Sequence, residues 1–335
     1  MPQIIIIEDS SIYDLGGGQR ITLEAIQCLS ADVENKLYLF DVGSGDKFRD
    51  QVSRHKIPSR FFGVRSIPDF FYKLPAIIFE ILKKTGSNKK FFLYPTTKKA
   101  LIVSVLIKLI HRHSIIVFHQ HSRLGPLFDV LKIFTDTVII PGVIAGKYSK
   151  KTVVIQNPVN ITKSKFQKKG CDDGHVMLGF IGSLTPHKGF DLFVETLASN
   201  QIDALVAGSG PLESIIIKNK KIKYLGYINE TDKEKFYKDI DILVFPSVVE
   251  ETFSLVCFEA IFNYSPIICF DIGYPSKVVE KYNVGVVAKS YTSDSLNIAI
   301  QECIKNINVF SANCEKVIED FENNNFCKGI VSVFR

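Results

Sequence analysis

Residues 240–262 read IDILVFPSVVEETFSLVCFEAIF. The opening residues form a nearly continuous apolar run, which is typical of a strand buried in a parallel sheet. A loop with Pro246 and two adjacent acids follows, and the pattern from Ser254 to Phe262 predicts a helix. Strand, loop and helix in this order place a ligand at the carboxyl end of the strand, where the helix start near Ser254 offers N–H groups to a phosphate.

This stretch resembles the Glu-x7-Glu element of retaining GT-B glycosyltransferases, specifically glycosyltransferase family 4. The usual form in that family is Pro-Ser, a few residues, then Glu-Gly-Phe-Gly-Leu-x-x-x-Glu-Ala. The matching residues are Glu251, Phe253, Leu255, Glu259 and Ala260, while Thr252 and Ser254 replace the two glycines.

The resemblance implies a donor site built on these residues. Glu259 would hold the ribose hydroxyls of the donor and Glu251 would hold its sugar. Phe253, Ser254 and Leu255 would complete the donor-binding loop. The alternative interpretation is a loop carboxylate and a half-buried helical glutamate with no ligand.

The chain has 335 residues, of which 46% are hydrophobic, so two domains with separate cores are expected. Strands and helices alternate in both halves, which predicts an α/β protein with two Rossmann-like parallel-sheet domains facing a cleft. The resemblance to GT-B enzymes implies an acceptor domain over residues 1–160 and a nucleotide-sugar donor domain over 161–335.

In the first domain, a strand at Gln3–Glu8 and a helix at Ile21–Leu29 flank a glycine-rich turn that contains Gly17 and Gly18. Such a turn lets the backbone approach a phosphate or a sugar closely. The turn is similar to the Gly-Gly-x-Glu/Gln-Arg turn of the same family, which implies donor contacts for both glycines. Further strands are predicted at 36–41, 91–94, 115–118, 137–140 and 152–156, and helices at 69–84, helical after Pro75, and 97–112.

Two histidines follow the strand predicted at 115–118. His119 stands directly at its end and His121 two residues further on. In the family, a His or His-Asp at the end of this strand faces the transferred sugar, so both residues are candidate catalytic residues, with His119 the better positional match. The alternative is a pair of ordinary loop histidines.

The second domain begins with a strand at 176–181 and a turn, Gly182 to Gly189, that resembles the family's Gly-Arg-Leu-x-x-x-Lys-Gly motif. Lys188 is retained for the donor diphosphate, whereas Ser183 stands in the position of the arginine. A serine cannot form the bidentate phosphate contact of an arginine, but it can donate one hydrogen bond. Further along, the resemblance implies that the backbone at Gly226 and Tyr227 meets the nucleotide base.

The seven cysteines contain no Cys-x-x-Cys pair, so neither a zinc site nor a disulfide framework is predicted, and a reducing cytosol is favoured. No Asp-x-Asp pair follows a strand in the second domain, so no metal is expected. The expected co-substrate is a nucleotide-diphosphate sugar, with no other cofactor. No signal peptide and no membrane-spanning run are recognised.

The positive charge is concentrated in the first half. Residues 1–160 hold 22 Lys and Arg against 13 Asp and Glu, and residues 51–112 alone hold 13 against 2. This excess predicts an anionic partner. Aromatic residues such as Tyr72 stand beside long aliphatic runs, which favours a membrane surface over nucleic acid. The alternative is a solvated basic face.

Together these features favour a cytoplasmic, metal-independent retaining glycosyltransferase, peripheral at the inner face of the membrane. Its acceptor would be a saccharide, lipid-linked in cell-surface polysaccharide or lipopolysaccharide synthesis. Two alternatives remain: a sugar-nucleotide epimerase of the same architecture, and a non-catalytic partner subunit of another glycosyltransferase, which Ser183 in place of arginine would fit.

Overall fold

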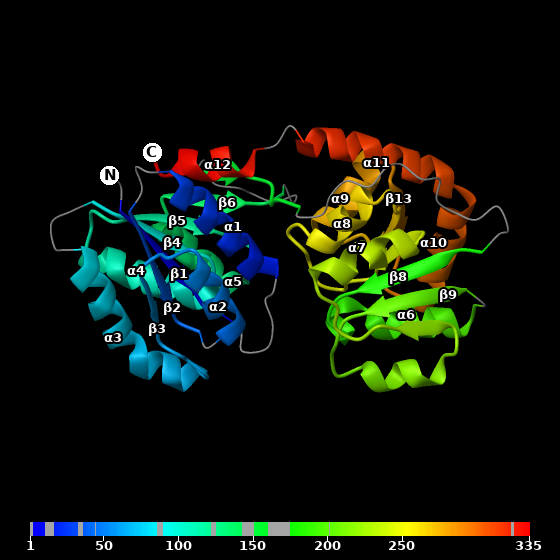
Figure 1. Ribbon diagram of the computed structural model, residues 1–335, viewed down its shortest axis with the longest axis horizontal. Helices are drawn as coiled ribbons and strands as arrows, with labels where there is room; N and C mark the ends of the chain where they lie inside the picture. Colours follow the sequence, from blue (N-terminus) through cyan, green and yellow to red (C-terminus); the bar gives the residue numbers. More distant parts are fainter. Residues whose placement is uncertain are drawn as a thin grey trace. The chain divides into compact units, whose positions relative to one another are not determined.

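The computed structural model describes residues 3–10, 17–32, 36–43, 45–85, 90–121, 125–142, 151–159, 175–200, 202–322 and 325–335. The chain forms two compact units (Figure 1). Unit 1 comprises Met1–Pro158 together with Asn325–Arg335, and unit 2 comprises Val159–Asn324. The sequence assigns residues 325–335 to the second domain, but in the structure they pack with unit 1. The polar, lysine-rich segment 162–174, whose composition indicates a linker, lies outside the described residues.

Unit 1 is built on a seven-stranded parallel sheet in the order β3-β2-β1-β4-β5-β6-β7. The strands are β1 Gln3–Glu8, β2 Lys36–Asp41, β3 Ser59–Phe61, β4 Phe92–Pro95, β5 Ile115–His119, β6 Thr137–Ile140 and β7 Thr152–Val154. The chain order reverses between β1 and β4. In sheets of this kind, ligands bind at the carboxyl ends of the strands at such a switch point.

The helices of unit 1 are α1 Gly17–Ala31, α2 Asp46–Arg54, α3 Ile67–Thr85, α4 Lys98–Ile110, α5 Pro126–Asp129, η1 Val130–Phe134 and α12 Phe326–Val333. Helix α1 contacts both α12 and α2, and α3 packs beside α4, which contacts η1 (Figure 1). The buried apolar residues of α3 and α4 form one core with the central strands.

Two helices differ from the prediction. Gly17 and Gly18 are the first residues of α1 rather than a turn, because Thr22 bonds both the Gly18 carbonyl (3.1 Å) and Glu8 (2.7 Å) and so holds the first helical turn. Helix α3 continues through Pro75 instead of starting after it. Phe70 and Ile77 are buried on either side of this proline, and their packing outweighs the lost backbone hydrogen bond.

Unit 2 is built on a six-stranded parallel sheet in the order β10-β9-β8-β11-β12-β13. Its strands are β8 Met177–Ile181, β9 Asp203–Ala207, β10 Ile222–Tyr224, β11 Ile242–Phe245, β12 Ile267–Phe270 and β13 Gly285–Ala288. Its helices are η2 Pro186–Lys188, α6 Phe190–Ala198, η3 Glu213–Lys218, α7 Glu230–Asp239, α8 Leu255–Phe262, α9 Gly273–Tyr282, α10 Ser293–Lys305 and α11 Ile307–Glu322. The switch point of this sheet lies between β8 and β11.

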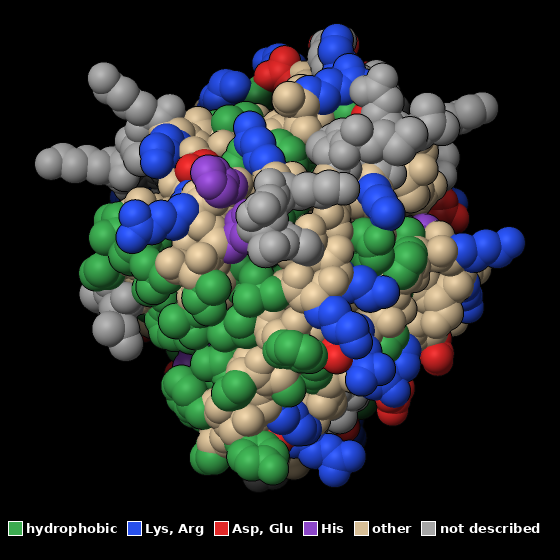
Figure 2. All heavy atoms as spheres, turned by 90° about the vertical axis from the view of Figure 1, so that its left-hand side faces the viewer, with side chains coloured by type: hydrophobic (Ala, Val, Ile, Leu, Met, Phe, Trp, Pro, Cys, Tyr) green, Lys and Arg blue, Asp and Glu red, His purple; other side chains and the backbone are tan. Residues whose placement is uncertain are grey.

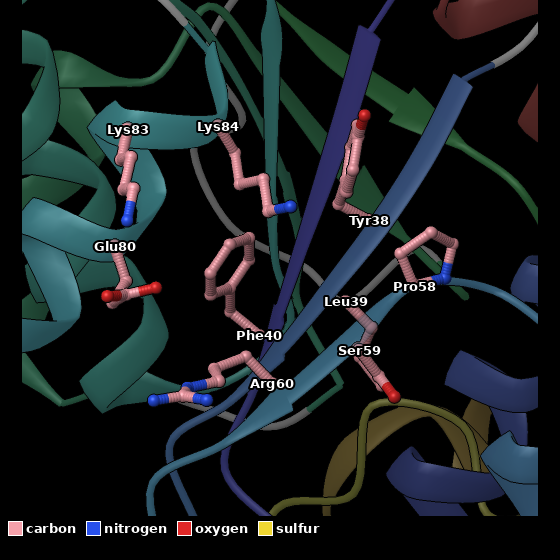
Figure 3. A pocket seen from close by; sticks show the side chains of 9 residues that line it. All are labelled: Tyr38, Leu39, Phe40, Pro58, Ser59, Arg60, Glu80, Lys83 and Lys84. Carbon is pink, nitrogen blue, oxygen red and sulfur yellow. The ribbon is translucent and has the colours of Figure 1, made fainter.

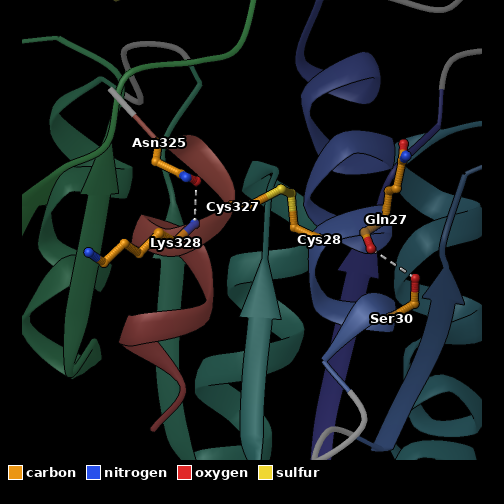
Figure 4. The surroundings of a disulfide bond; sticks show 6 residues. All are labelled: Gln27, Cys28, Ser30, Asn325, Cys327 and Lys328. Atoms are coloured by element: carbon orange, nitrogen blue, oxygen red, sulfur yellow. Dashed lines mark hydrogen bonds between the residues drawn. A yellow bond between two sulfur atoms is a disulfide. The ribbon is translucent and has the colours of Figure 1, made fainter. Parts of the chain in front are cut away.

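A disulfide joins Cys28 of α1 to Cys327 of α12, with the two Cα atoms 5.0 Å apart (Figure 4). The expectation that no cysteines are bridged is therefore wrong. The two residues are 299 positions apart in the sequence, so no spacing pattern could indicate that helix packing brings them together. The cysteines consequently no longer support a reducing compartment. Cys257, Cys269, Cys303 and Cys314 are buried and keep their thiols.

Helix length and hydropathy bear on how the chain could meet a membrane. Of the helices that the structure describes, not one combines the length and the apolar content needed to cross a bilayer.

Candidate active site

In unit 2, the turn after β8 and the loop after β11 lie against each other at the switch point. The Val248 amide donates to the His187 carbonyl at 3.0 Å. Gly189 has a φ of 65°, and a Cβ there would lie 1.9 Å from the carbonyl oxygen of Pro246. Glycine is required at this position because any side chain would collide with the backbone of the loop. The two motifs singled out from the sequence are thus brought together.

Lys188 and Glu251 form an ion pair at this junction, from the Nζ of the lysine to the Oε1 of the glutamate. Both side chains are partly exposed, and the Lys188 ammonium also lies 5.8 Å from the centre of the Phe245 ring. The predicted phosphate-binding cation and the predicted sugar-binding carboxylate therefore meet directly. In this arrangement the two charges neutralise each other.

Helix α9 holds the loop that carries Glu251. The Tyr274 amide donates to the Glu251 carbonyl at 2.8 Å. Gly273 has a φ of 76°, and a Cβ on it would lie 2.5 Å from the same carbonyl oxygen. The start of α9 can approach this closely only because residue 273 is glycine. The backbone of Glu251 is therefore fixed, while its side chain reaches Lys188.

Ser183, Gly226 and Tyr227 lie along the same edge of the sheet. Ser183 is exposed in the turn after β8, and the next residue, Leu184, donates its amide to Ser209 at 2.9 Å. The amide of Gly208 donates to the Gly226 carbonyl at 2.8 Å. The turns that follow β8, β9 and β10 are thus linked in series by backbone hydrogen bonds.

The loop residues before α8 divide into core and surface. Phe253 is buried and stacks on Phe258, with ring centres 4.3 Å apart, so its side chain belongs to the core. Ser254 has a φ of 71°, a left-handed conformation that favours glycine. The structure therefore keeps the backbone shape of the glycine that the motif usually has here, at a cost of about 1 kcal/mol or more. Leu255, the first residue of α8, is partly buried.

Glu259 is buried in α8 and both of its carboxylate oxygens are engaged. Oε1 pairs with the Lys233 ammonium at 2.5 Å, and Oε2 accepts from the Tyr237 hydroxyl at 2.6 Å. Lys233 and Tyr237 come from α7 and are themselves buried. This pair was not anticipated from the sequence, although the i, i+4 spacing of its two α7 members places them on one helix face. It holds the Glu259 carboxylate in one orientation.

In unit 1, the candidate histidines lie at the carboxyl end of β5. His119 is fully buried, and its Nδ1 lies 2.6 Å from the Tyr94 hydroxyl. Among the described residues, its Nε2 has no hydrogen-bond partner. If Tyr94 donates to Nδ1, one group, the Nε2–H donor, has no hydrogen-bond partner among the described residues. If instead Nδ1–H donates to the tyrosine oxygen, two groups have none: the tyrosine hydroxyl proton and the Nε2 lone pair. Burial therefore favours the first arrangement.

The charge state of both histidines follows from their burial. Burial holds the pKa of His119 well below its usual value of 6.5, with a smaller contribution from His121, and burial lowers the pKa of His121 to about 4. Both rings are neutral near pH 7. The rings lie 4.1 Å apart, and Gly18 is so close that a Cβ on it would lie 3.4 Å from the His121 ring. The structure thus brings Gly18, His119 and His121 together, whereas Gly17 is exposed.

A buried carboxyl accompanies this group and was not anticipated from the sequence. Glu8 ends β1 and accepts from Thr22 and Thr96, each at 2.7 Å, and from the Asp9 amide at 3.0 Å. Burial raises its pKa from 4.5 to about 7, although these hydrogen bonds act in the opposite direction. The sequence did contain a signal for Glu8, because an acidic residue ends an apolar strand there, beside the switch point.

No metal site is evident within the described part of the chain, where His, Cys, Asp and Glu nowhere gather in a group of three or more that could hold an ion. The expectation of metal independence stays a prediction.

Comparison with known families finds a match within the second unit. Residues 162–319 match the model of the family "Glycosyl transferases group 1". The matched residues lie within unit 2 and make up a little less than half of the chain. With its two parallel α/β units, the chain as a whole has the GT-B architecture, as predicted.

Individual proteins and solved structures are also similar to this chain. An uncharacterized glycosyltransferase of Methanocaldococcus jannaschii is 25% identical over 181 residues, which are 50% of this chain and 46% of that protein. The chain thus spans about half the length of this curated relative. Crystal structures of Anabaena HepE with UDP superpose with a TM-score of 0.75 at 19% identity, covering 99% of this chain and 98% of that one. The lipopolysaccharide outer core galactosyltransferase WaaB gives 0.72 at 13% identity, covering 97% and 99%.

Proposed function

We propose that this protein is a retaining, metal-independent glycosyltransferase that moves a sugar from a nucleotide-diphosphate sugar to a saccharide acceptor, which is lipid-linked. The observation that carries the proposal is the Lys188–Glu251 pair at the switch point of the unit that matches the group 1 glycosyltransferase model. The Anabaena HepE structures hold UDP and UDP-glucose, so these two compounds are the first probes for the donor.

In this proposal the ion pair separates when the donor binds. Departure of the nucleotide diphosphate develops negative charge, which Lys188 and the N–H groups at the start of α8 stabilise. Glu251, released from the lysine, is then available to the hydroxyls of the transferred sugar. Glu259, held by Lys233 and Tyr237, receives the ribose hydroxyls.

The role of His119 in unit 1 follows from its hydrogen bond. With Tyr94 donating to Nδ1, the remaining ring nitrogen is an N–H donor for a hydroxyl of the sugar. A neutral imidazole in this state orients the sugar and does not act as a proton acceptor. We therefore assign His119 to positioning, with the His121 ring packed against it.

The ion pair allows a direct test by titration calorimetry with UDP. Lys188→Ala should weaken binding by about 1.5–3 kcal/mol, roughly 10- to 150-fold in Kd, because a charge-assisted hydrogen bond is lost. Glu251→Gln should leave UDP affinity equal or tighter, because the lysine no longer has a competing carboxylate. Lys221→Ala is the matched control. This lysine is paired with Asp203 at 3.2 Å and directly precedes β10. It therefore lies at the amino ends of the strands, whereas Lys188 lies at their carboxyl ends.

Turnover is measured as release of UDP from UDP-glucose, in EDTA and then with added Mg²⁺. Glu251→Gln should lower this rate on the order of 100-fold while UDP affinity is retained. UDP affinity that is the same in Lys188→Ala as in the unaltered protein would refute the donor site. Activity that disappears in EDTA and returns with Mg²⁺ would refute metal independence. Binding of UDP without any turnover would favour a non-catalytic partner subunit.

A further inference from the structure

Helix α3 is apolar on its solvent side as well as on its buried side. Phe70, Ile77 and Ile81 are buried against the core of unit 1. On the opposite side Phe71, Tyr72 and Phe79 are 58%, 85% and 64% exposed. Pro68, Pro75 and Ala76 are exposed on the same side. A surface helix normally presents polar residues to water. Packing within the chain therefore does not explain why these exposed side chains are apolar.

The stripe continues onto the neighbouring elements. Leu109 and Ile110 are exposed at the end of α4, and Val130 and Ile133 are exposed on η1. Helix α3 packs beside α4, and α4 contacts η1. We call the exposed apolar residues of α3, α4 and η1 the apolar face. Figure 2 shows hydrophobic side chains gathered over this side of unit 1, with Lys and Arg side chains along one margin.

Beside α3 lies a pocket with a basic lining. It has a volume of about 340 Å³ and is formed by the end of α3 and the strands β2 and β3 (Figure 3). Arg60, Lys83 and Lys84 line it, against a single carboxylate, Glu80. Tyr38 and Phe40 supply apolar walls, and the Lys84 ammonium lies 5.7 Å from the centre of the Tyr38 ring. Such a lining suits an anionic group attached to an apolar chain.

We propose that the apolar face docks on a lipid bilayer with anionic headgroups, and that the pocket of Arg60, Lys83 and Lys84 receives a headgroup phosphate. The inference deepens the proposed function, on which it rests for the lipid-linked nature of the acceptor. Aromatic residues that lie beside cations match the boundary between acyl chains and headgroups. Residues 51–112 hold 13 Lys and Arg against 2 Asp and Glu, and each cation near such a surface strengthens binding to anionic lipid.

A second copy of the chain fits this face less well than lipid does. Two copies that met through it would bring two basic margins together, which is unfavourable at low ionic strength. An anionic bilayer instead complements the charge and covers the aromatic side chains in one step. Nucleic acid would complement the charge but would leave Phe71, Tyr72 and Phe79 against a polar backbone.

Sedimentation with vesicles tests the proposal, using phosphatidylcholine alone and phosphatidylcholine mixed with phosphatidylglycerol. The unaltered protein should bind the anionic vesicles at least tenfold more strongly, and less at high salt, because the electrostatic part is screened. Phe71→Ser with Phe79→Ser should lower binding at least tenfold. Arg60→Ala with Lys83→Ala should reduce the preference for anionic vesicles. Ile298→Ser, which removes an exposed apolar residue of α10 in unit 2, is the matched control and should change nothing.

The outcomes separate this inference from the proposed function. UDP affinity and the thermal midpoint are measured on every variant, and both should stay unchanged, because all four substituted residues of unit 1 are exposed. Equal sedimentation with both kinds of vesicle, or binding that survives the two phenylalanine substitutions, would overturn the docking surface even if UDP still binds. A dimer that the same substitutions dissociate would assign the face to a second copy instead. If the unaltered protein does not bind UDP, this result would count against the proposed function and not against the docking surface.

Discussion

Glu8 should make unit 1 less stable as the pH rises, and Glu8→Gln should remove this dependence. The carboxyl is buried at the end of β1, and burial raises its pKa from 4.5 to about 7. Between these two values the unfolded chain has lost the proton while the folded unit still holds it. The stabilisation is therefore complete below pH 4.5 and is lost as the pH rises through 7.

The magnitude follows from the difference between the two pKa values. A difference of about 2.5 units, at 1.36 kcal/mol for each unit, gives about 3 kcal/mol. Glutamine has nearly the same shape but no proton to lose. The stability of the Glu8→Gln variant relative to the unaltered protein should therefore increase by about 3 kcal/mol from pH 4.5 to pH 8. The lowered pKa values of His119 and His121 make the folded unit less stable as the pH falls. Both residues are present in both proteins, so their contributions to the difference cancel.

Hydrogen exchange measured by mass spectrometry can follow unit 1 separately from unit 2. Peptides from β1 and β4 are compared between the two proteins at pH 4.5, 6 and 8, so intrinsic exchange rates cancel at each pH. Glu24→Gln, at a half-buried position on α1, is the control for replacing a glutamate by glutamine in the same unit. A flat difference for Glu8→Gln, or one that shrinks as the pH rises, would refute the assignment of a protonated buried carboxyl.

Two further predictions concern the surroundings of the histidine pair. Tyr94→Phe removes the donor to Nδ1 of His119 and should lower turnover of UDP-glucose at least tenfold, while UDP affinity stays within a few-fold. Nitrogen NMR of the imidazole would then show loss of a single Nε2–H tautomer, and an unchanged tautomer would contradict the assignment. Cys28→Ser should destabilise unit 1 by about 2–4 kcal/mol, the usual effect of losing a native disulfide. Reductant should lower the thermal midpoint of the unaltered protein to that of the variant, and thiol titration should find two additional thiols after reduction. A midpoint that reductant leaves in place would argue against the bond.

Much of the framework followed from local pattern. The strands at Gln3–Glu8, Lys36–Asp41 and Thr137–Ile140 have the predicted bounds. These segments are apolar runs or regular amphipathic repeats, so the sequence of each one alone indicates which of its side chains are buried. Where a local rule conflicts with packing, the prediction failed, as at Pro75, where buried residues on both sides keep the helix continuous.

The candidate site was predictable to the level of motifs but not of pairings. The sequence indicated Lys188 and Glu251 individually, since each belongs to a recognisable turn. It could not indicate that they form an ion pair, because that depends on Gly189 fitting beneath Pro246. Likewise Glu259 was singled out, whereas the lysine and tyrosine of α7 that hold it became evident only when α7 and α8 were seen packed together.

The C-terminal helix explains why unit 1 is not one continuous segment of the sequence. The chain leaves this unit after Pro158 and returns at Asn325, so the unit is completed only by the last residues. There Phe334 packs edge-on against the Tyr94 ring, with ring centres 5.3 Å apart, and Tyr94 is the residue that bonds His119. The disulfide fixes the same helix to α1, whose first turn places Gly18 against His121. Because the segments on both sides of the histidine pair are joined covalently, loss of α12 should disturb the orientation of His119 as well as the stability of the sheet.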